Sequence, residues 1–233
     1  MLEVTQIHSY YGRAHILGGV SLGVASGEVV ALLGRNGAGK STTMKTIMGL
    51  VRASAGKVVF NNTEVQRWSP HRICQLGVGY VPEERRVFTA LSVDENLEVG
   101  RQPSRHGLTP WSPERLFDLF PNLARMRDRP GGQMSGGEQQ MLTIARTLMG
   151  NPQLVLLDEP SEGLAPVIVD QMADAIATLK QEGLAIVLSE QNIQFATRVA
   201  DRAYIIETGT IRYQCTMAQL AADEEVRKHY LSV

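Results

Sequence analysis

The sequence predicts an α/β protein built on a mainly parallel β-sheet that helices cover. The first observation behind this prediction is a short apolar run at 29–33, typical of a buried strand, that leads through a glycine-rich loop to apolar residues at helical spacing in 41–50. The second is an alternation of strand-like and helical segments after residue 150, which parallel strands require because their connections are long crossovers. The strand-like runs are 154–157, 184–188 and 203–206, and the helical stretches are 166–181, 193–200 and 217–232.

The N-terminal half predicts several shorter strands. In the first thirty residues we expect strands interrupted at Tyr11-Gly12, Gly18-Gly19 and Ser26-Gly27, because glycine at such points commonly marks a turn. Further strands are expected at 57–60 and 78–81.

A second, helical lobe is predicted to begin near Phe88. Ser92 and Glu95 have the spacing of a capping box, which marks a helix start. The stretch 101–112 contains two prolines and a glycine and predicts an exposed loop. An apolar stripe follows, and core packing of the lobe explains it better than a ligand pocket does. Its residues are Leu116, Phe117, Phe120, Leu123 and Met126.

Length and composition limit the class of protein. The 233 residues suit one domain, or one domain with an inserted lobe, and the net charge of −1 gives no global attraction to nucleic acid or anionic lipid. Cys74 and Cys215 are far apart, which argues against a disulfide framework or zinc site and suits a reducing cytosol. The N-terminus does not resemble a signal peptide, and the apolar runs are too short to span a bilayer. A membrane role would therefore require another subunit.

The loop after the strand at 29–33 has the pattern G-x-x-x-x-G-K-S. Such a loop can wrap around phosphates, because successive backbone N–H groups and the positive end of the following helix face the negative charge. Lys40 adds a full charge, and Ser41 offers a hydroxyl to Mg²⁺. The alternative is a glycine-rich turn that binds nothing. The predicted strand before the loop and the predicted helix after it favour the phosphate-binding loop over this alternative. The loop is Gly34-Arg35-Asn36-Gly37-Ala38-Gly39-Lys40-Ser41-Thr42.

Two carboxylates, Asp158 and Glu159, directly follow the strand at 154–157. Ligands gather at the carboxyl ends of such strands. Asp158 can hold Mg²⁺, and Glu159 can orient and deprotonate an attacking water, a general-base role worth roughly 10²–10⁴ in rate. Both could instead be solvated loop acids. Their combination with the glycine-rich loop favours a shared site.

A second helix start also has the features of an anion site. Ser135 and Glu138 form a capping-box pattern, which by itself indicates only the beginning of a helix. Gly136 and Gly137 follow the serine and leave backbone N–H groups unshielded at the positive helix terminus. The chain thus contains two helix starts suited to phosphate.

These three motifs, in this order, resemble those of ATP-binding cassette (ABC) ATPases across nearly the full chain, and the run Ser135-Gly136-Gly137-Glu138-Gln139-Gln140 is similar to the family signature. The resemblance implies a RecA-like P-loop core with an N-terminal antiparallel β-subdomain and an inserted α-helical subdomain. It predicts a single ABC ATPase domain over 1–233, with the core at about 1–87 and 147–233 and the helical subdomain at about 88–146.

The resemblance also implies a nucleotide sandwich between two subunits, with ATP and Mg²⁺ as ligands. Ser135, Gly136 and Gly137 of one subunit would close on the γ-phosphate that the glycine-rich loop of the other subunit holds. Tyr11 would stack on adenine. The adjacent Tyr10 is the alternative, and either ring can simply pack against a strand.

Three positions depart from the family pattern. Glu83 replaces a common glutamine; that position contacts Mg²⁺ or the attacking water, and a carboxylate can bind the metal because the metal's charge reverses the local electrostatics. Gln191 replaces the usual histidine; an amide can donate a hydrogen bond to the γ-phosphate but does not titrate near neutral pH, so Glu159 is the preferred base. Ala165 stands where an aspartate is common.

The departures point to a subfamily. Gly-Leu-Ala-Pro at 163–166 and Glu-Gln-Asn at 190–192 are similar to the ATPase subunits of branched-chain amino acid importers, and the related urea and short-chain amide importers share the segments 11–17 and 34–37. The resemblance implies an ATP-hydrolysing importer subunit, peripheral on the cytoplasmic face of the cell membrane. Its expected partners are transmembrane permease subunits, a second ABC ATPase subunit (another copy or a similar chain) and, indirectly, a periplasmic solute-binding protein, with no nucleic acid. A non-transport ABC ATPase and a non-hydrolysing binding module are the alternatives.

Overall fold

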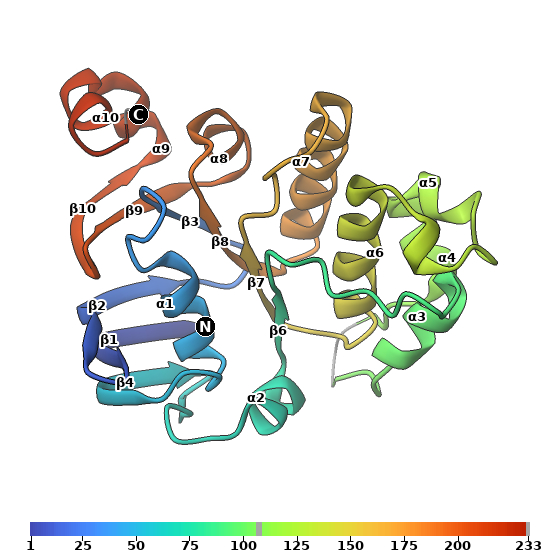
Figure 1. Cartoon of the computed structure of the whole chain (residues 1–233), viewed down its shortest axis with the longest axis horizontal. Coiled ribbons are helices and arrows are strands. Elements are labelled where there is room, and N and C mark those ends of the chain that lie inside the picture. Colours follow the sequence, from blue (N-terminus) through green and yellow to red (C-terminus); the bar gives the residue numbers. More distant parts are fainter. Residues whose placement is uncertain (106–108, 232–233) are drawn as a thin grey trace.

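The computed structural model describes residues 1–105 and 109–231, and its larger β-sheet has six strands (Figure 1). All neighbouring strands pair in parallel except the last two along the chain, which pair antiparallel. The predicted mainly parallel sheet is therefore confirmed. The spatial order is β10 (Thr210–Thr216), β9 (Arg202–Glu207), β3 (Val29–Leu33), β8 (Ala185–Glu190), β7 (Leu154–Asp158) and β6 (Val78–Val81).

The N-terminal part forms a separate antiparallel sheet, as expected. Its order is β2 (Ala14–Val24), β1 (Leu2–Tyr11), β4 (Ala53–Phe60) and β5 (Thr63–Glu64). The predicted interruption at Gly18-Gly19 is wrong, because β2 continues through both glycines. Ile7 pairs with Val20 and His8 with Gly18, so Gly19, at φ +92°, is accommodated as an extra residue in a bulge.

The parallel sheet is buried on both faces, and β3 shows how. Val30 and Leu32 pack with the N-terminal sheet and with α1 (Lys40–Ile47), whereas Ala31 and Leu33 pack on the opposite side. That opposite layer is formed by α6 (Gly136–Leu148), α7 (Pro166–Gln181), α8 (Ile193–Val199) and α9 (Met217–Ala222). The end of β3 and the start of α1 are therefore both held by packed neighbours. This packing fixes the path of the loop that connects them.

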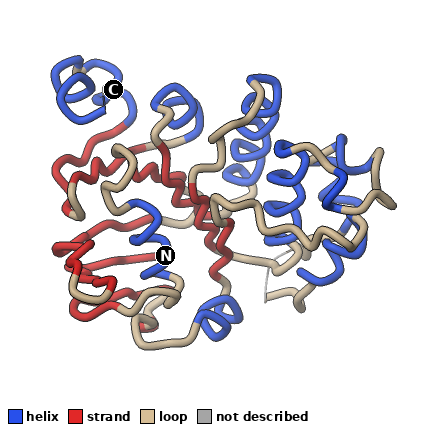
Figure 2. The backbone as a smooth tube through the Cα atoms, in the orientation of Figure 1, coloured by secondary structure: helices blue, strands red, loops and turns tan. Residues whose placement is uncertain are grey.

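Short helices gather around α6 at one side of the molecule, apart from the N-terminal sheet (Figures 1 and 2). The capping box at Ser92 is confirmed: its hydroxyl accepts from the Glu95 N–H, and Glu95 accepts from the Ser92 N–H. The predicted apolar stripe is core, with Met126 only partly buried. The helices are α3 (Val93–Gly100), α4 (Pro113–Leu119), α5 (Pro121–Ala124) and the 3₁₀ turn Gly131–Gln133.

Two predicted segments extend into residues outside the described ones. The predicted loop at 101–112 includes 106–108, and its described residues have no regular structure. Arg105 anchors it, because its guanidinium donates to the carbonyls of Gly150 and Asn151. The predicted helical end at 217–232 is confirmed through α9 and α10 (Glu224–Leu231), while Ser232 lies outside the described residues. Helix α2 (Pro70–Leu76), strand β5 and strand β10 were not predicted from the sequence.

An ion pair lies at the start of β3, between the residue that precedes β3 and the first residue of the neighbouring strand β9. Glu28 is 19% exposed; it accepts from the Arg202 guanidinium and, at 2.7 Å, from the Ala25 N–H. Burial opposes ionisation of this carboxyl, but the hydrogen bonds from Arg202 and Ala25 and the charge of Arg202 outweigh it and lower the pKa of Glu28. A lowered pKa in the folded state means that the pair stabilises the fold above the carboxyl's ordinary pKa and loses this effect as pH falls.

Replacing Glu28 by glutamine is therefore expected to lower the free energy of unfolding at pH 7 by about 1–3 kcal/mol. Urea unfolding at pH 7 and pH 4 measures the deficit, which should shrink at the lower pH because the Glu28 carboxyl of the unfolded parent chain then takes up a proton and the parent loses part of its advantage. An equal deficit at both pH values would contradict the assignment. The exposed pair of Glu64 and Lys57 offers a control, since Glu64→Gln should cost far less.

Candidate active site

The glycine-rich loop follows a tight path from β3 into α1. Gly34 lies so close to the neighbouring strand that a Cβ atom there would be 2.4 Å from the Ile206 carbonyl oxygen. Gly39, immediately before the helix, has φ +111°, which a side chain strongly disfavours. The Gly209 N–H also donates to the Ala38 carbonyl at 2.8 Å. Packing against the β9–β10 turn thus sets the shape of the loop.

The start of α1 faces a cavity of about 290 Å³. The hydrogen bond from the Thr43 N–H to the Gly39 carbonyl closes the first helical turn, so the N–H groups of Lys40, Ser41 and Thr42 precede the intrahelical bonds. These groups and the positive helix end are suited to an anion. The residues lining the cavity are Asn36, Gly37, Gly39, Lys40, Ser41, Thr42, Glu83, Glu159 and Glu162.

The Lys40 side chain is almost fully buried, and its ammonium contacts three oxygen atoms. Its Nζ donates to the carbonyls of Gly34 at 2.8 Å and Arg35 at 3.2 Å, and it lies 2.9 Å from Oε1 of Glu159. The ammonium therefore holds the predicted base and the predicted phosphate loop together. An incoming phosphate would compete with Glu159 for the same charge.

The Asp158 carboxylate sits at the centre of a hydrogen-bond network at the end of β7. Oδ1 accepts from the hydroxyls of Ser41 at 3.0 Å and Ser189 at 2.6 Å, and Oδ2 accepts from Tyr80 at 3.0 Å. Burial, together with the charge and hydrogen bond of Asp158, raises the pKa of Tyr80, so the phenol stays protonated as a donor. Ser41 and Asp158 were predicted from the sequence as site residues, whereas Ser189 and Tyr80 were not.

Glu159 is held in a strained backbone conformation. Its φ is +47°, uncommon for a residue with a side chain, and its N–H donates to both the carbonyl and the hydroxyl oxygen of Ser189 at 3.1 Å. The conformation turns the carboxylate toward Lys40 and the cavity. Strain of this kind clusters at functional positions, because the surrounding structure has to enforce it.

A further carboxylate, Glu162, lines the same cavity and was not singled out from the sequence. Burial and the neighbouring charges of Glu159 and Glu83 raise the pKa of Glu162. Glu83, an exposed residue of the loop after β6, therefore does reach the site. The residues that line the cavity include three carboxylates, those of Glu83, Glu159 and Glu162, and one lysine. Binding of a cation there would reduce the repulsion between the carboxylates.

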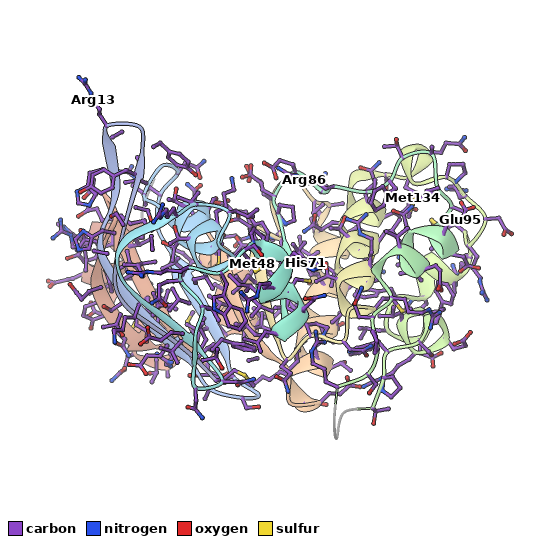
Figure 3. All side chains as sticks on the ribbon, turned by 90° about the horizontal axis from the view of Figure 1, so that it is seen from below. Arg13, Met48, His71, Arg86, Glu95 and Met134 are labelled. Carbon is purple, nitrogen blue, oxygen red and sulfur yellow. The ribbon has the colours of Figure 1, made fainter. Side chains whose placement is uncertain are left out.

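The other predicted site residues lie outside this cavity. Tyr11 ends β1 and is 50% exposed, whereas the Tyr10 ring stacks on His15 with 4.4 Å between centroids. Gln191, partly buried, follows β8 two residues beyond Ser189. Ser135 is exposed at the start of α6, with the predicted capping box to Glu138 confirmed. Figure 3 shows its neighbour Met134 on the helical side, away from the two sheets.

A glycine-lysine loop at a helix start, facing a buried aspartate and a glutamate at the end of the adjacent strand, defines a P-loop nucleotide hydrolase. A family model described as "ABC transporter" matches residues 17–162. This chain belongs to the ABC transporter family, as an ATP-binding subunit with ATPase activity.

Several curated relatives match over almost their whole length. The chain is 42% identical to the high-affinity branched-chain amino acid transport ATP-binding protein BraG of Pseudomonas aeruginosa, covering 99% of both chains. It is 37% identical to the lipopolysaccharide export system ATP-binding protein LptB of Haemophilus influenzae, covering 99% of this chain and 97% of the relative. It is 33% identical to a probable branched-chain amino acid transport ATP-binding protein LivF of Archaeoglobus fulgidus, covering 98% and 97%.

Solved structures support the same fold. A nucleotide-free ATP-binding cassette from an ABC transporter aligns with a TM-score of 0.82 at 27% identity, covering 97% of this chain and 96% of the other. The ADP conformation of another ABC transporter cassette aligns with a TM-score of 0.82 at 26% identity, covering 98% and 97%. The predicted fold class is confirmed.

Proposed function

We propose that this chain is the ATPase subunit of a bacterial importer for branched-chain, hydrophobic amino acids. The full-length likeness to the Pseudomonas branched-chain amino acid transport protein carries the proposal, and the Archaeoglobus relative supports it. An importer of urea or short-chain amides is the nearest alternative. The 37% identity to a lipopolysaccharide export protein makes an export ATPase the second candidate.

In the proposed mechanism the phosphates of ATP lie on the loop 34–42, against the N–H groups at the start of α1. Lys40 then exchanges its contact with Glu159 for the phosphates. This exchange releases the Glu159 carboxylate toward a water molecule, which it orients and deprotonates. Gln191 would donate a hydrogen bond to the γ-phosphate from the end of β8.

The residues present fit Mg²⁺, which prefers oxygen ligands. The Ser41 hydroxyl and the Asp158 carboxylate already lie 3.0 Å apart, and the ring of carboxylates around Lys40 favours a cation. In the described part of the chain, no group of three or more His, Cys, Asp or Glu residues could form a metal site, so phosphate and water would complete the coordination. The ion would neutralise charge on the phosphates, with Ser41 and Asp158 holding it and Glu83 contacting it.

We also propose that two ABC subunits enclose each nucleotide. The exposed helix start at Ser135, Gly136 and Gly137 would contact the γ-phosphate bound by the facing subunit. Tyr11 would stack on adenine, a role favoured over Tyr10 because Tyr10 already stacks on His15. In this arrangement the phosphate loop belongs to the proposed core at 1–87 and 147–233, and the helix start at Ser135 belongs to the proposed helical subdomain at 88–146.

No helix among residues 1–105 and 109–231 is long and apolar enough to cross a membrane. We therefore infer that permease subunits provide the membrane path, and that this chain docks on the cytoplasmic face through the loop 83–88 and the helical subdomain. A solute-binding protein would deliver the solute to the opposite face.

The proposal is tested by isolating the complex from membranes and measuring uptake. Tagged chain should co-purify a permease, and cells carrying Lys40→Ala should lose uptake of labelled leucine while retaining uptake of labelled urea. Loss of urea uptake alone would favour the amide importer. Co-purification of lipopolysaccharide export components with intact leucine uptake would contradict the proposal.

A further inference from the structure

The loop between β6 and α3, which carries Glu83, is tied firmly to the helical side of the molecule. The buried Asn96 carboxamide accepts from the Phe88 N–H at 2.9 Å and donates to the carbonyls of Phe88 and Leu91. The Arg146 guanidinium donates to the Arg86 carbonyl and lies 4.9 Å from the Phe88 ring centroid. The second half of the loop therefore moves with α3 and α6.

Arg85 joins the same loop to the segment after Glu159 and to the start of α6. Its Nη2 donates to the carbonyl of Glu162 at 2.6 Å, in the segment that follows Glu159. Its Nη1 approaches the start of α6 so closely that a Cβ atom on Gly136 would lie 2.3 Å away, and a Cβ atom on Gly163 would lie 3.5 Å from Nη2. One guanidinium thus lies against two functional segments, the one after Glu159 and the start of α6, and it belongs to the loop that carries Glu83.

Two observations indicate that the surrounding structure holds the Arg85 guanidinium in an otherwise unfavourable position. Arg85 has φ +47°, a conformation that a residue with a side chain rarely adopts. Its charge also lies beside the positive N-terminus of α6, where a cation is unfavourable, and no carboxylate among residues 1–105 and 109–231 forms an ion pair with it. By contrast, the next residue, Arg86, is exposed (Figure 3). Its guanidinium lies 3.5 Å from the Glu84 carboxylate.

We propose that Arg85 is a positioning residue for ATP hydrolysis. It links the loop of Glu83, the segment after Glu159 and the serine-glycine-glycine helix start, so that the three segments keep one relative arrangement. Arg85 suits this role because its planar guanidinium has five N–H donors in a fixed geometry and can serve several segments at once. Its charge also favours an anion at the start of α6. The inference rests on the proposed function in one respect: it takes Glu159 as the base.

The linkage is tested with Arg85→Gly, Arg85→Lys and the control Arg212→Ala, which alters an exposed arginine of β10 that lies 3.5 Å from Glu207. Glycine removes the guanidinium and adopts φ +47° without strain, so the melting temperature should not fall. We expect Arg85→Gly to lower kcat for Mg·ATP by about tenfold or more, because small displacements of catalytic groups are costly, and to leave ADP affinity unchanged within about twofold. Arg85→Lys should fall between, and Arg212→Ala should match the parent.

A kcat for Arg85→Gly within about twofold of the parent would overturn the linkage, as would a matching loss in the control Arg212→Ala. A parallel weakening of ADP binding would also overturn it, because Arg85 touches no residue of the phosphate loop. Lys40→Ala, measured in the same assay, separates the two hypotheses. If Lys40→Ala is inactive while Arg85→Gly is normal, only the linkage fails; if both are active, the proposed site itself fails.

Discussion

Replacing Glu159 by glutamine is expected to slow steady-state ATP hydrolysis by about 10²–10⁴-fold while leaving nucleotide binding largely intact. The amide keeps the size of the side chain and can still contact Lys40 through its oxygen, but it cannot take a proton from water. The strained backbone at φ +47° is unchanged by this substitution. Phosphate release measures the turnover, and calorimetric titration with Mg·ATP measures binding.

Glu84→Gln provides the matched control for this experiment. Glu84 is an exposed carboxylate beside Glu83, and it is absent from the residues that line the cavity. Its neutralisation should leave turnover unchanged. Near-parental turnover in Glu159→Gln would remove Glu159 as the base and would direct attention to Glu162 or Glu83, the other carboxylates in the cavity.

Replacing Lys40 by alanine is expected to abolish turnover and to weaken ATP binding strongly, because the phosphates lose their one lysine partner in the cavity. The substitution also leaves the Glu159 carboxylate, 9% exposed, without its cation at 2.9 Å. Breaking a buried pair in this way costs about 3–5 kcal/mol, so the nucleotide-free protein should be less stable as well. Calorimetric titration and urea unfolding measure the two effects.

Lys45→Ala is the control on the same helix, since Lys45 lies in the last turn of α1 and outside the cavity. It should retain both turnover and affinity. Undiminished ATP affinity in Lys40→Ala would contradict the assignment of the loop 34–42 as the phosphate site. In the double variant Lys40→Ala and Glu159→Gln, part of the lost stability should return, because no uncompensated carboxylate remains.

The sequence predicted the site wherever a motif constrains the backbone. Position 34 requires glycine because a neighbouring strand lies close to it, and position 39 requires glycine because its φ is positive. The spacing of these glycines to Lys40 identifies the loop from the sequence alone. Helix α7 was predicted with its observed bounds, because proline, an apolar face and a terminal glycine all agree. The sequence contains these local signals directly.

What the sequence could not predict depends on where loops and side chains meet. The hydrogen bond from Tyr80 to Asp158 joins residues 78 positions apart, and the contact of Arg85 with Glu162 spans 77. Strand β10 buries only Cys215 and so lacks the apolar pattern of the central strands. The bulge at Gly19 was missed because a glycine pair within a strand and one in a turn look alike in sequence.

The proposed sandwich requires that the exposed helix start at Ser135 completes the nucleotide site of a facing subunit. Sedimentation of Glu159→Gln with and without Mg·ATP measures whether such a pair forms, because blocked hydrolysis should trap the closed pair. The mass should rise from the 25.6 kDa of one chain to twice that value with Mg·ATP, and should remain at one chain in Ser135→Glu. Saturation with Mg·ATP at the mass of a single chain would contradict the claim.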